Sequence, residues 1–387
     1  GVSDGAAAAV VTTPEIAMRM LDWLVDGYGT NADATWLVDY HEIWIVPTVN
    51  PDGHRLVELG AESGGSPYYQ RKNANQTNGC TVWPPTMSTQ YGVDLNRNHS
   101  FKWGGAGTST SPCSQTFRGF SAASEPEVAA VQVLIRSLIS DQRGPGDNDA
   151  APANTQGVFI TLHSYSELIL WPWGYTNTTA PNKAGLQAIG DKMATYNGYT
   201  SCQPGSCLYA ASGTSDDWAY GELGIPSFTF ELGSSFMPFY QTIDGEQWPD
   251  NGPALQYAAK IARRPYQLAF GPDILNIQTS ITSTQPITLT ATLDDRNNGN
   301  RALQTAVYTI DAPPWRSNVI THTLSAVDAA FDSPTEEVTA VLPPLPPGKH
   351  TLYLQGQDAD GNWGAVSAAF VEIPFTDWLY LPLIGKN

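Results

Sequence analysis

The chain has 387 residues, of which 41% are hydrophobic, and its formal net charge is −18 at pH 7. This length favours two domains with real hydrophobic cores. The acidic balance argues against nucleic acid and anionic membranes as partners, because both bind clustered Lys and Arg. No stretch approaches the roughly 18 consecutive apolar residues of a membrane span, so we expect none.

The first predicted elements are a helix, a strand and a second helix. Pro14, preceded by a capping hydroxyl, predicts a helix start. The apolar run 41–49 predicts a buried strand. Ser124 and Glu127 have the spacing of a capping box and predict that a second helix begins there.

Strand and helix patterns continue to alternate up to about residue 270. Short apolar segments at 157–164 and 226–232 predict strands, and apolar residues at helical spacing around Ile189 predict a helix between them. A last helix is expected after Pro253, with Arg263 and Arg264 in its final turn. Strands separated by helices predict an α/β domain with a mixed, mainly parallel sheet flanked by helices.

The pattern changes at residue 271. Residues 273–375 hold Thr- and Val-rich alternating runs separated by turn-rich segments, which predict a small Ig- or fibronectin-like β-sandwich. The sequence DADGN (358–362) is too short for a calcium loop and predicts a hairpin turn. The aromatic-apolar tail 376–387 is either a last strand or the remnant of a sorting segment. The expected domains are therefore 1–271 and 272–375, followed by this tail.

The cysteine content favours two disulfides and a secreted protein. There are four cysteines, and Cys202 and Cys207 flank a Pro-Gly turn that suits a small disulfide loop. The even count and the scarcity of lysine are typical of extracellular proteins. Four free thiols are the alternative, and the spacing does not fit a zinc ribbon.

Two predicted strands end in residues that suit catalysis. Active sites in open α/β sheets form beyond the carboxyl ends of strands, where His163 and Glu231 are expected. A lone histidine there is more often structural, but Glu231 follows uncharged residues, and an ionised carboxylate in such surroundings needs a partner or a task. Further candidates are groups that bind anions: Arg71, Asn96, Arg97 and Tyr209. Together they suit hydrolysis of an amide beside a free carboxylate.

Six stretches carry a resemblance to a known family. They are TVNPDGHRL, YQRKN, GVDLNRN, SPCSQTFRG with SEPE, TLHSYSELILWPWGYT and LYAASGTSDDWAYGELGIPSFTFELG. In this order the chain resembles the zinc metallocarboxypeptidases of the pancreatic A/B type and their bacterial relatives, over roughly residues 10–270. The resemblance implies a monomeric, zinc-dependent hydrolase that removes the C-terminal residue of peptides or proteins.

The resemblance also implies roles for the catalytic candidates. His163 matches the third Zn²⁺ ligand, and Glu231 matches the general base that passes a proton from water to the leaving amine. Arg71 matches the guanidinium that stabilises the oxyanion. Asp94 matches an acid that orients a zinc-binding histidine.

Substrate-binding roles follow from the same resemblance. Asn96, Arg97 and Tyr209 match the group that holds the terminal carboxylate of the substrate. Asp216 matches the floor of the specificity pocket, where an acid selects Lys or Arg. Alternatively, Asp216 caps a local turn and Asp217 faces solvent. Cys80 and Cys113 match the family's disulfide around the segment 91–98.

The family's first two zinc ligands, from a His-x-x-Glu motif, have no match in this chain. Alignment on TTPE puts Ala7 and Val10 in their places. Catalytic zinc takes three protein ligands, so His163 alone does not suffice and Asp94 is left without its partner. Three explanations stay open: an enzyme whose N-terminal part is missing here, a metal-free protein that binds peptide C-termini, and a cell-surface interaction module. The retention of Glu231 favours the enzyme.

Overall fold

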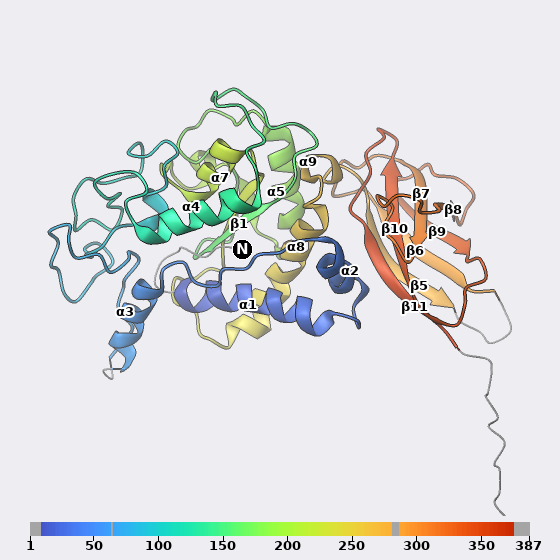
Figure 1. Cartoon of the computed structure of the whole chain (residues 1–387), viewed down its shortest axis with the longest axis horizontal. Coiled ribbons are helices and arrows are strands. Elements are labelled where there is room, and N and C mark those ends of the chain that lie inside the picture. The colour runs from blue at the N-terminus through green and yellow to red at the C-terminus, as the bar shows by residue number, and fades with distance from the viewer. Residues whose placement is uncertain (1–8, 63–64, 281–285, 375–387) are drawn as a thin grey trace, which may run out of the picture. The chain divides into compact units, whose positions relative to one another are not determined.

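The computed structural model describes residues 9–62, 65–280 and 286–374, and the chain divides into two compact units (Figure 1). The first unit comprises Gly1–Asp26 and Tyr40–Phe270, and the second comprises Gly27–Asp39 and Gly271–Asn387. The sequence pattern places residues 27–39 in the first domain, whereas the structure groups them with the second unit. No described helix is long and apolar enough to cross a membrane.

A short mixed sheet forms the centre of the first unit. Its strand order is β1-β4-β2-β3, with bounds β1 Phe159–His163, β2 Leu168–Leu170, β3 Thr200–Cys202 and β4 Ser227–Glu231. The pairs β1–β4 and β2–β3 are parallel, and β2–β4 is antiparallel. The predicted mixed sheet and its strands at 157–164 and 226–232 are thus confirmed. Every residue of β1 is buried, as expected for a strand covered on both faces.

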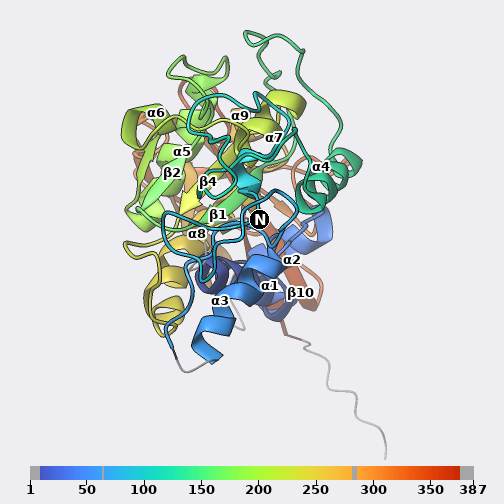
Figure 2. The ribbon, with the colours of Figure 1, turned by 90° about the vertical axis from the view of Figure 1, so that its left-hand side faces the viewer.

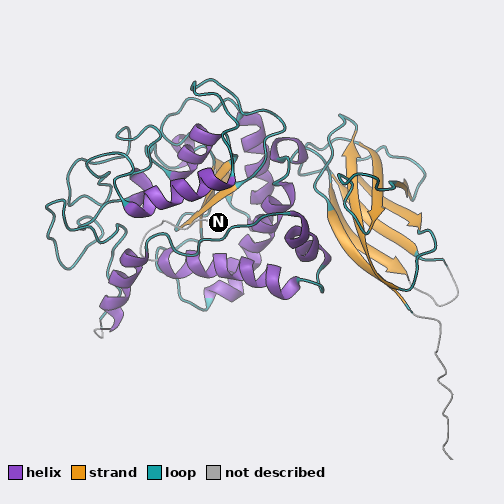
Figure 3. Cartoon of the chain, viewed as in Figure 1, coloured by secondary structure: helices purple, strands orange, loops and turns teal. Residues whose placement is uncertain are grey.

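Helices surround this sheet (Figures 2 and 3). Their bounds are α1 Ala9–Gly27, α3 Pro51–Glu62, α4 Pro126–Leu138, α5 Lys183–Asn197, α6 Pro204–Cys207, α7 Ser215–Leu223, α8 Trp248–Ile261 and α9 Pro265–Leu268, with a 3₁₀ turn at Leu95–Arg97 and a π-helical turn at Ile243–Gln247. One apolar cluster packs α4 and α7 against β1 and includes Val128, Ile135, Phe159 and Trp218. This cluster fixes the start of α7, which carries Asp216, relative to the sheet.

Two predictions about the first part of the chain are wrong. The run 41–49 is not a strand: it contains a single bridge residue, and Trp44 is 51% exposed. Apolar composition alone does not make a strand, because a ladder also requires a partner strand in register. Helix α1 begins at Ala9, so Pro14 lies inside the helix instead of at its start.

Two helix boundaries also differ from the sequence prediction. The N-cap of helix α4 is Glu125, and its side chain makes no capping hydrogen bond. The Ser124 hydroxyl donates to the Glu125 carboxylate (2.8 Å), so Ser124 and Glu127 do not form the predicted capping box. Helix α8 begins before Pro253 and ends at Ile261, so Arg263 and Arg264 follow the helix.

The second unit is an antiparallel β-structure. Its strand order is β11-β10-β7-β8-β9-β6-β5, with bounds β5 Asp273–Ser280, β6 Thr288–Asp294, β7 Leu303–Ile310, β8 His322–Ala326, β9 Thr335–Val341, β10 Gly348–Asp358 and β11 Ser367–Ile373. Inward-facing residues of most strands form one core that includes Leu293, Leu324, Val338 and Leu352. The predicted C-terminal β-domain is confirmed. The Asp358 carboxylate accepts hydrogen bonds from the main chain and side chain of Asn362 (2.7 and 2.8 Å), which closes the predicted turn. The tail 376–387 lies outside the described residues.

Helix α2 (Ala32–Tyr40), which the sequence did not predict, contacts the β-strands through one carboxylate. Asp33 Oδ1 accepts hydrogen bonds from the backbone N–H of Ala368 in β11 (2.8 Å) and from Trp36 Nε1 (2.9 Å). Trp36 is fully buried and packs edge-on against Trp315, with ring centroids 5.8 Å apart. These contacts explain why residues 27–39 belong to the second unit.

Candidate active site

The carboxyl ends of β1 and β4 bring two candidate residues together. His163 and Glu231 are the last residues of their strands and are register partners in the parallel pair. Neighbouring strands are about 4.8 Å apart, so the two residues lie side by side at one edge of the sheet. This is the edge where sites form in α/β folds.

A pocket of about 50 Å³ opens at this edge and gathers the candidate residues. It is lined by Arg71, Asn96, Arg97, His163, Tyr209, Asp216 and Glu231, together with Leu170, Gly174, Pro204, Leu208, Ala211, Thr214 and Thr229. Seven of the eight residues singled out from the sequence therefore share one pocket, and Asp94 contacts two of them, Arg71 and Asn96. Larger hollows of about 410 and 170 Å³ lie beside residues 41–45 and contain none of these candidates.

Arg97 is a buried cation without an anionic partner among the described residues. It is 3% exposed. Its Nε donates to Gly107 O (3.0 Å), Nη1 to Asn96 O (2.7 Å) and Nη2 to the Tyr209 hydroxyl (3.3 Å). These neutral acceptors use three of five N–H groups. They fix the orientation of the guanidinium and leave two donors for a ligand.

Asn96 is oriented by helix α7. Its Oδ1 accepts the Ser215 N–H at the helix start (2.9 Å), and its Nδ2 lies 3.4 Å from Nε2 of His163. Because the acceptor atom is occupied, the amide presents its donor side to the pocket. The sequence stretch 94–98 thus delivers two adjacent donors of hydrogen bonds, Asn96 and Arg97, to one place.

Two neighbouring acids in the first turn of α7 have different surroundings. Asp217 is fully buried and accepts the N–H groups of Gly174 and Tyr175 (both 2.8 Å), so the alternative in which it faces solvent is wrong. Burial raises the pKa of Asp217 well above its usual value, and the negative charge of Asp216 raises it further. Asp216 is 4% exposed and lines the pocket, and its carboxylate forms no ion pair or hydrogen bond with any described residue.

Asp94 has a partner after all. Its carboxylate accepts Arg71 Nε at 2.9 Å and also the Asn96 N–H at 3.2 Å. Burial lowers the pKa of Arg71, but the charge and hydrogen bond of Asp94, together with Tyr209 and Glu231, outweigh this effect and the net pKa is raised. Asp94 thus pairs with Arg71, whereas the zinc-binding histidine that the resemblance implies as its partner has no match in this chain. Its ion pair holds the Arg71 guanidinium, whose remaining N–H groups can serve the pocket.

The described residues do not form a complete zinc site. They contain no group of three His, Cys, Asp or Glu side chains arranged to hold a metal ion. His163 is the only described residue that matches a zinc ligand of the family, and three protein ligands are needed.

Comparisons with known proteins identify the family. A sequence profile of zinc carboxypeptidases matches residues 5–247. The chain belongs to the zinc carboxypeptidase family. A zinc carboxypeptidase of Saccharothrix mutabilis subsp. capreolus is 38% identical over 231 residues, which are 57% of this chain and 46% of that protein. Carboxypeptidase B of Bos taurus is 32% identical over 216 residues, which are 53% of this chain and 44% of that protein. The chain thus spans about half the length of these relatives.

Solved structures support the same fold. Carboxypeptidase A from Helicoverpa armigera aligns with a TM-score of 0.51 and 24% sequence identity, over 68% of this chain and 60% of that chain. At this level of identity the likeness establishes the fold of the first unit, and the roles of individual residues rest on the site geometry described above.

Sequence reasoning missed the residues that support the site. Asp217 was not singled out for any role, although it accepts two backbone hydrogen bonds that fix the turn beside the pocket. Gln90 was not singled out, although its Oε1 accepts the Arg71 N–H (2.8 Å). Neither contact has a signal in sequence spacing, because the partners are more than 15 residues apart and lie in irregular segments.

Proposed function

We propose that this protein is a carboxypeptidase that removes C-terminal Lys or Arg from peptides. One observation carries the proposal: Arg97 and Asp216 are buried charges of opposite sign in one pocket, and neither has a counter-ion among the described residues. A buried charge without a partner costs several kcal/mol. A ligand that carries both a carboxylate and a cation, as a C-terminal Lys or Arg does, neutralises both.

In the proposed complex the terminal carboxylate binds Arg97, Asn96 and the Tyr209 hydroxyl. The two free N–H groups of Arg97 and the amide N–H of Asn96 are donors that match carboxylate oxygens. The side chain of the terminal residue then extends past Leu208 and Thr229 toward Asp216. The Cys202–Cys207 disulfide, with a Cα–Cα distance of 6.4 Å, closes the loop that carries Pro204 on the wall of this pocket.

The scissile peptide bond lies on the other side of the pocket in this proposal, beside Arg71 and Glu231. Arg71 donates to the carbonyl oxygen and stabilises the negative charge that develops there. Glu231 takes a proton from the attacking water and transfers it to the nitrogen of the leaving amino acid. The C–N bond breaks, and the products are a shortened peptide and free Lys or Arg.

A second candidate is a protein that binds peptide C-termini without cleaving them. The incomplete metal-ligand set of the described residues favours it. Glu231 favours the enzyme, since binding of a terminal carboxylate does not require a base beside the scissile bond. Both candidates share the recognition pocket and differ in turnover.

We also propose that the protein is secreted. Both predicted disulfides, Cys80–Cys113 and Cys202–Cys207, are confirmed, and no cysteine is free among the described residues. Disulfides form and persist in oxidising compartments.

The test compares peptides that differ only at the C-terminus. The purified protein, supplied with zinc, is incubated with one peptide ending in Arg, Lys, Phe or Leu, and with the Arg peptide as its C-terminal amide. We expect mass spectrometry to show loss of Arg and Lys first and no loss from the amide. Binding without mass change establishes the second candidate, and cleavage of the amide contradicts both.

A further inference from the structure

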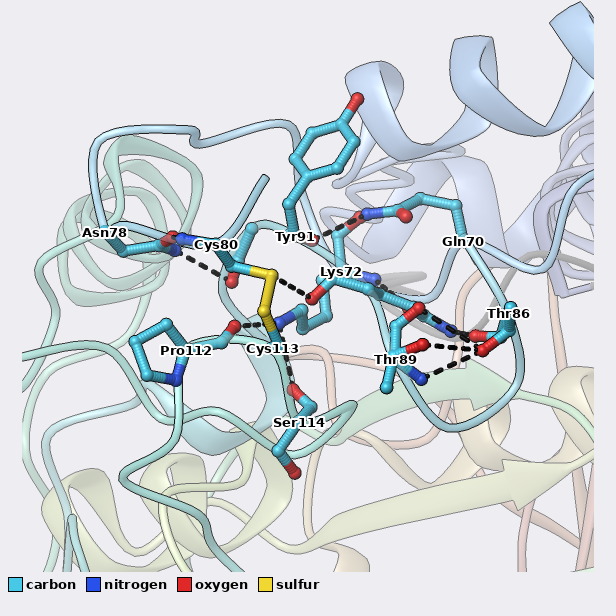
Figure 4. Close-up of a disulfide and its surroundings, with 12 residues drawn as sticks. Gln70, Lys72, Asn78, Cys80, Thr86, Thr89, Tyr91, Pro112, Cys113 and Ser114 are labelled. Atoms are coloured by element: carbon cyan, nitrogen blue, oxygen red, sulfur yellow. Dashed lines mark hydrogen bonds between the residues drawn. A yellow bond between two sulfur atoms is a disulfide. The ribbon is translucent and has the colours of Figure 1, made fainter. Parts of the chain in front are cut away.

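Lys72 is a fully buried lysine beside the Cys80–Cys113 disulfide (Figure 4). Its ammonium donates to the carbonyl oxygens of Pro112 (2.7 Å) and Ser114 (2.9 Å). It also lies 5.6 Å from the centre of the Phe117 ring. Lys72 therefore joins the segment that carries Arg71 to the loop 112–114.

A second connection runs through Gln90. Its side-chain Oε1 accepts the Arg71 N–H (2.8 Å), and its own backbone N–H donates to Cys113 O (2.9 Å). The Cys80–Cys113 disulfide, with a Cα–Cα distance of 5.2 Å, ties the same loop to residue 80. Both neighbours of the disulfide in the loop, Pro112 and Ser114, are the acceptors of Lys72.

Residues 66–76 have no regular secondary structure, so no helix or strand ladder holds Arg71 in place. Gln70 Nε2 donates to three carbonyl oxygens, those of Lys72, Asn73 and Tyr91 (3.0 to 3.1 Å). The main chain at Arg71 is thus fixed by side chains of residues 70, 72 and 90 and by the disulfide loop. The Arg71 carbonyl also accepts Asn50 Nδ2 (3.2 Å), and Asp94 holds the guanidinium (2.9 Å), so the position of Arg71 depends on side-chain contacts throughout.

The charge of Lys72 does not serve stability. Burial lowers its pKa to about 8, while Asp94 partly opposes this effect. A lysine whose pKa falls on folding makes the folded state less stable at neutral pH than an unperturbed lysine would. An apolar side chain could fill the same space without this loss of stability. What the ammonium adds is its two hydrogen bonds to the loop 112–114.

We propose that Lys72 is a positioning residue for Arg71, and that it acts through the loop 112–114 that the Cys80–Cys113 disulfide closes. It does not touch the substrate. The inference rests on the proposed role of Arg71 at the scissile carbonyl. A misplacement of about 1 Å in such a group can cost about 100-fold in rate.

The test uses Lys72→Met in the full chain, with Lys192→Met as the matched control. Lys192 is also buried, in α5, where it lies 5.2 Å from the Tyr196 ring centre and far along the chain from Arg71. Amide hydrogen exchange is followed by mass spectrometry in peptides that cover 68–76 and 110–117. We expect faster exchange in both peptides for Lys72→Met and no change there for Lys192→Met.

Kinetics on a peptide ending in Arg provide the functional readout. For Lys72→Met we expect kcat to fall by roughly 10- to 100-fold with little change in KM, since the groups that bind the terminal carboxylate are untouched. The pair Cys80→Ser with Cys113→Ser should have a similar effect, and combining it with Lys72→Met should add little, because both changes release the same loop.

The outcomes separate this inference from the proposed function. If the parent protein shows no turnover, the proposed function fails, and the exchange data alone decide the role of Lys72. Unchanged exchange at 68–76, or an equal effect of Lys192→Met, overturns the inference. If Lys72→Met does not fold, Lys72→Gln and the cysteine pair provide the same comparison.

Discussion

Replacement of Asp216 by Asn removes one negative charge from the pocket while preserving its shape. Asp216 is 4% exposed and has no partner among the described residues, so a bound Lys or Arg side chain would form a nearly desolvated ion pair with it. Loss of one partner of a buried pair costs about 3 to 5 kcal/mol. At about 1.4 kcal/mol per tenfold change, the preference for Arg over Leu should fall by at least roughly 100-fold.

The same substitution has the opposite effect on the protein without ligand. Removal of an unpaired buried charge should raise the thermal midpoint of the free protein. It should also lower the pKa of Asp217, because the charge of Asp216 contributes to the raised pKa of that group. When folding raises the pKa of an acid, the protein loses stability as the pH rises above the pKa that this acid has in the unfolded chain. We expect this loss to be smaller in Asp216→Asn.

The assay is the ratio of kcat/KM for peptides ending in Arg and in Leu, together with thermal unfolding of the free protein. Asp217→Asn is the control: it should destabilise the protein, because Asp217 holds the Gly174 and Tyr175 N–H groups, but it should keep the Arg preference. An unchanged Arg-to-Leu ratio in Asp216→Asn would refute the pocket assignment, whatever the thermal data show.

Three further predictions concern other contacts. The stability of the parent relative to Lys72→Met should rise by up to about 3 kcal/mol between pH 8 and 10.5. The reason is that Lys72 loses its proton at about pH 8 in the folded protein and near pH 10.5 in the unfolded chain. Chemical denaturation that shows the same pH dependence for both proteins would contradict this. Arg97→Met should raise KM at least tenfold without loss of stability, measured by kinetics and thermal unfolding, and an unchanged KM would exclude Arg97 as the carboxylate site. Asp33→Ala should lower the unfolding free energy of the second unit by about 1 to 3 kcal/mol, since Ala368 and Trp36 lose their acceptor. An unchanged denaturation midpoint would show that these hydrogen bonds do not stabilise the unit.

Much of the fold could be predicted where local pattern and burial agree. Strands β1 and β4 are short apolar runs in a fully covered sheet, and the strands of the second unit show clear alternation. The run 41–49 has the same apolar character, but the described structure gives it no ladder, and pairing is not a local property. Helix α2 has a weak amphipathic pattern and was missed. Helix α3 was missed although its pattern is amphipathic, because it begins with Pro-Asp-Gly, a sequence that is typical of turns.

The candidate site residues could be identified from their order and type in the sequence. The residues that support them could not. Arg97 and Asp216 are identifiable as candidates because the proposed ligand, with a carboxylate and a cation, would require groups of opposite charge. The ion pair between Arg71 and Asp94, and the bonds of Lys72 to the disulfide loop, join residues at least 23 apart through irregular segments. Such contacts depend on tertiary folding, and spacing in the sequence carries no signal of them.

The most direct test of the proposed pocket is a crystal structure of the protein with free L-arginine bound. We predict that the carboxylate of the ligand contacts Arg97 and Asn96, and that its guanidinium lies within about 4 Å of the Asp216 carboxylate. Arginine bound in the reverse orientation, or outside this pocket at saturating concentration, would contradict the account.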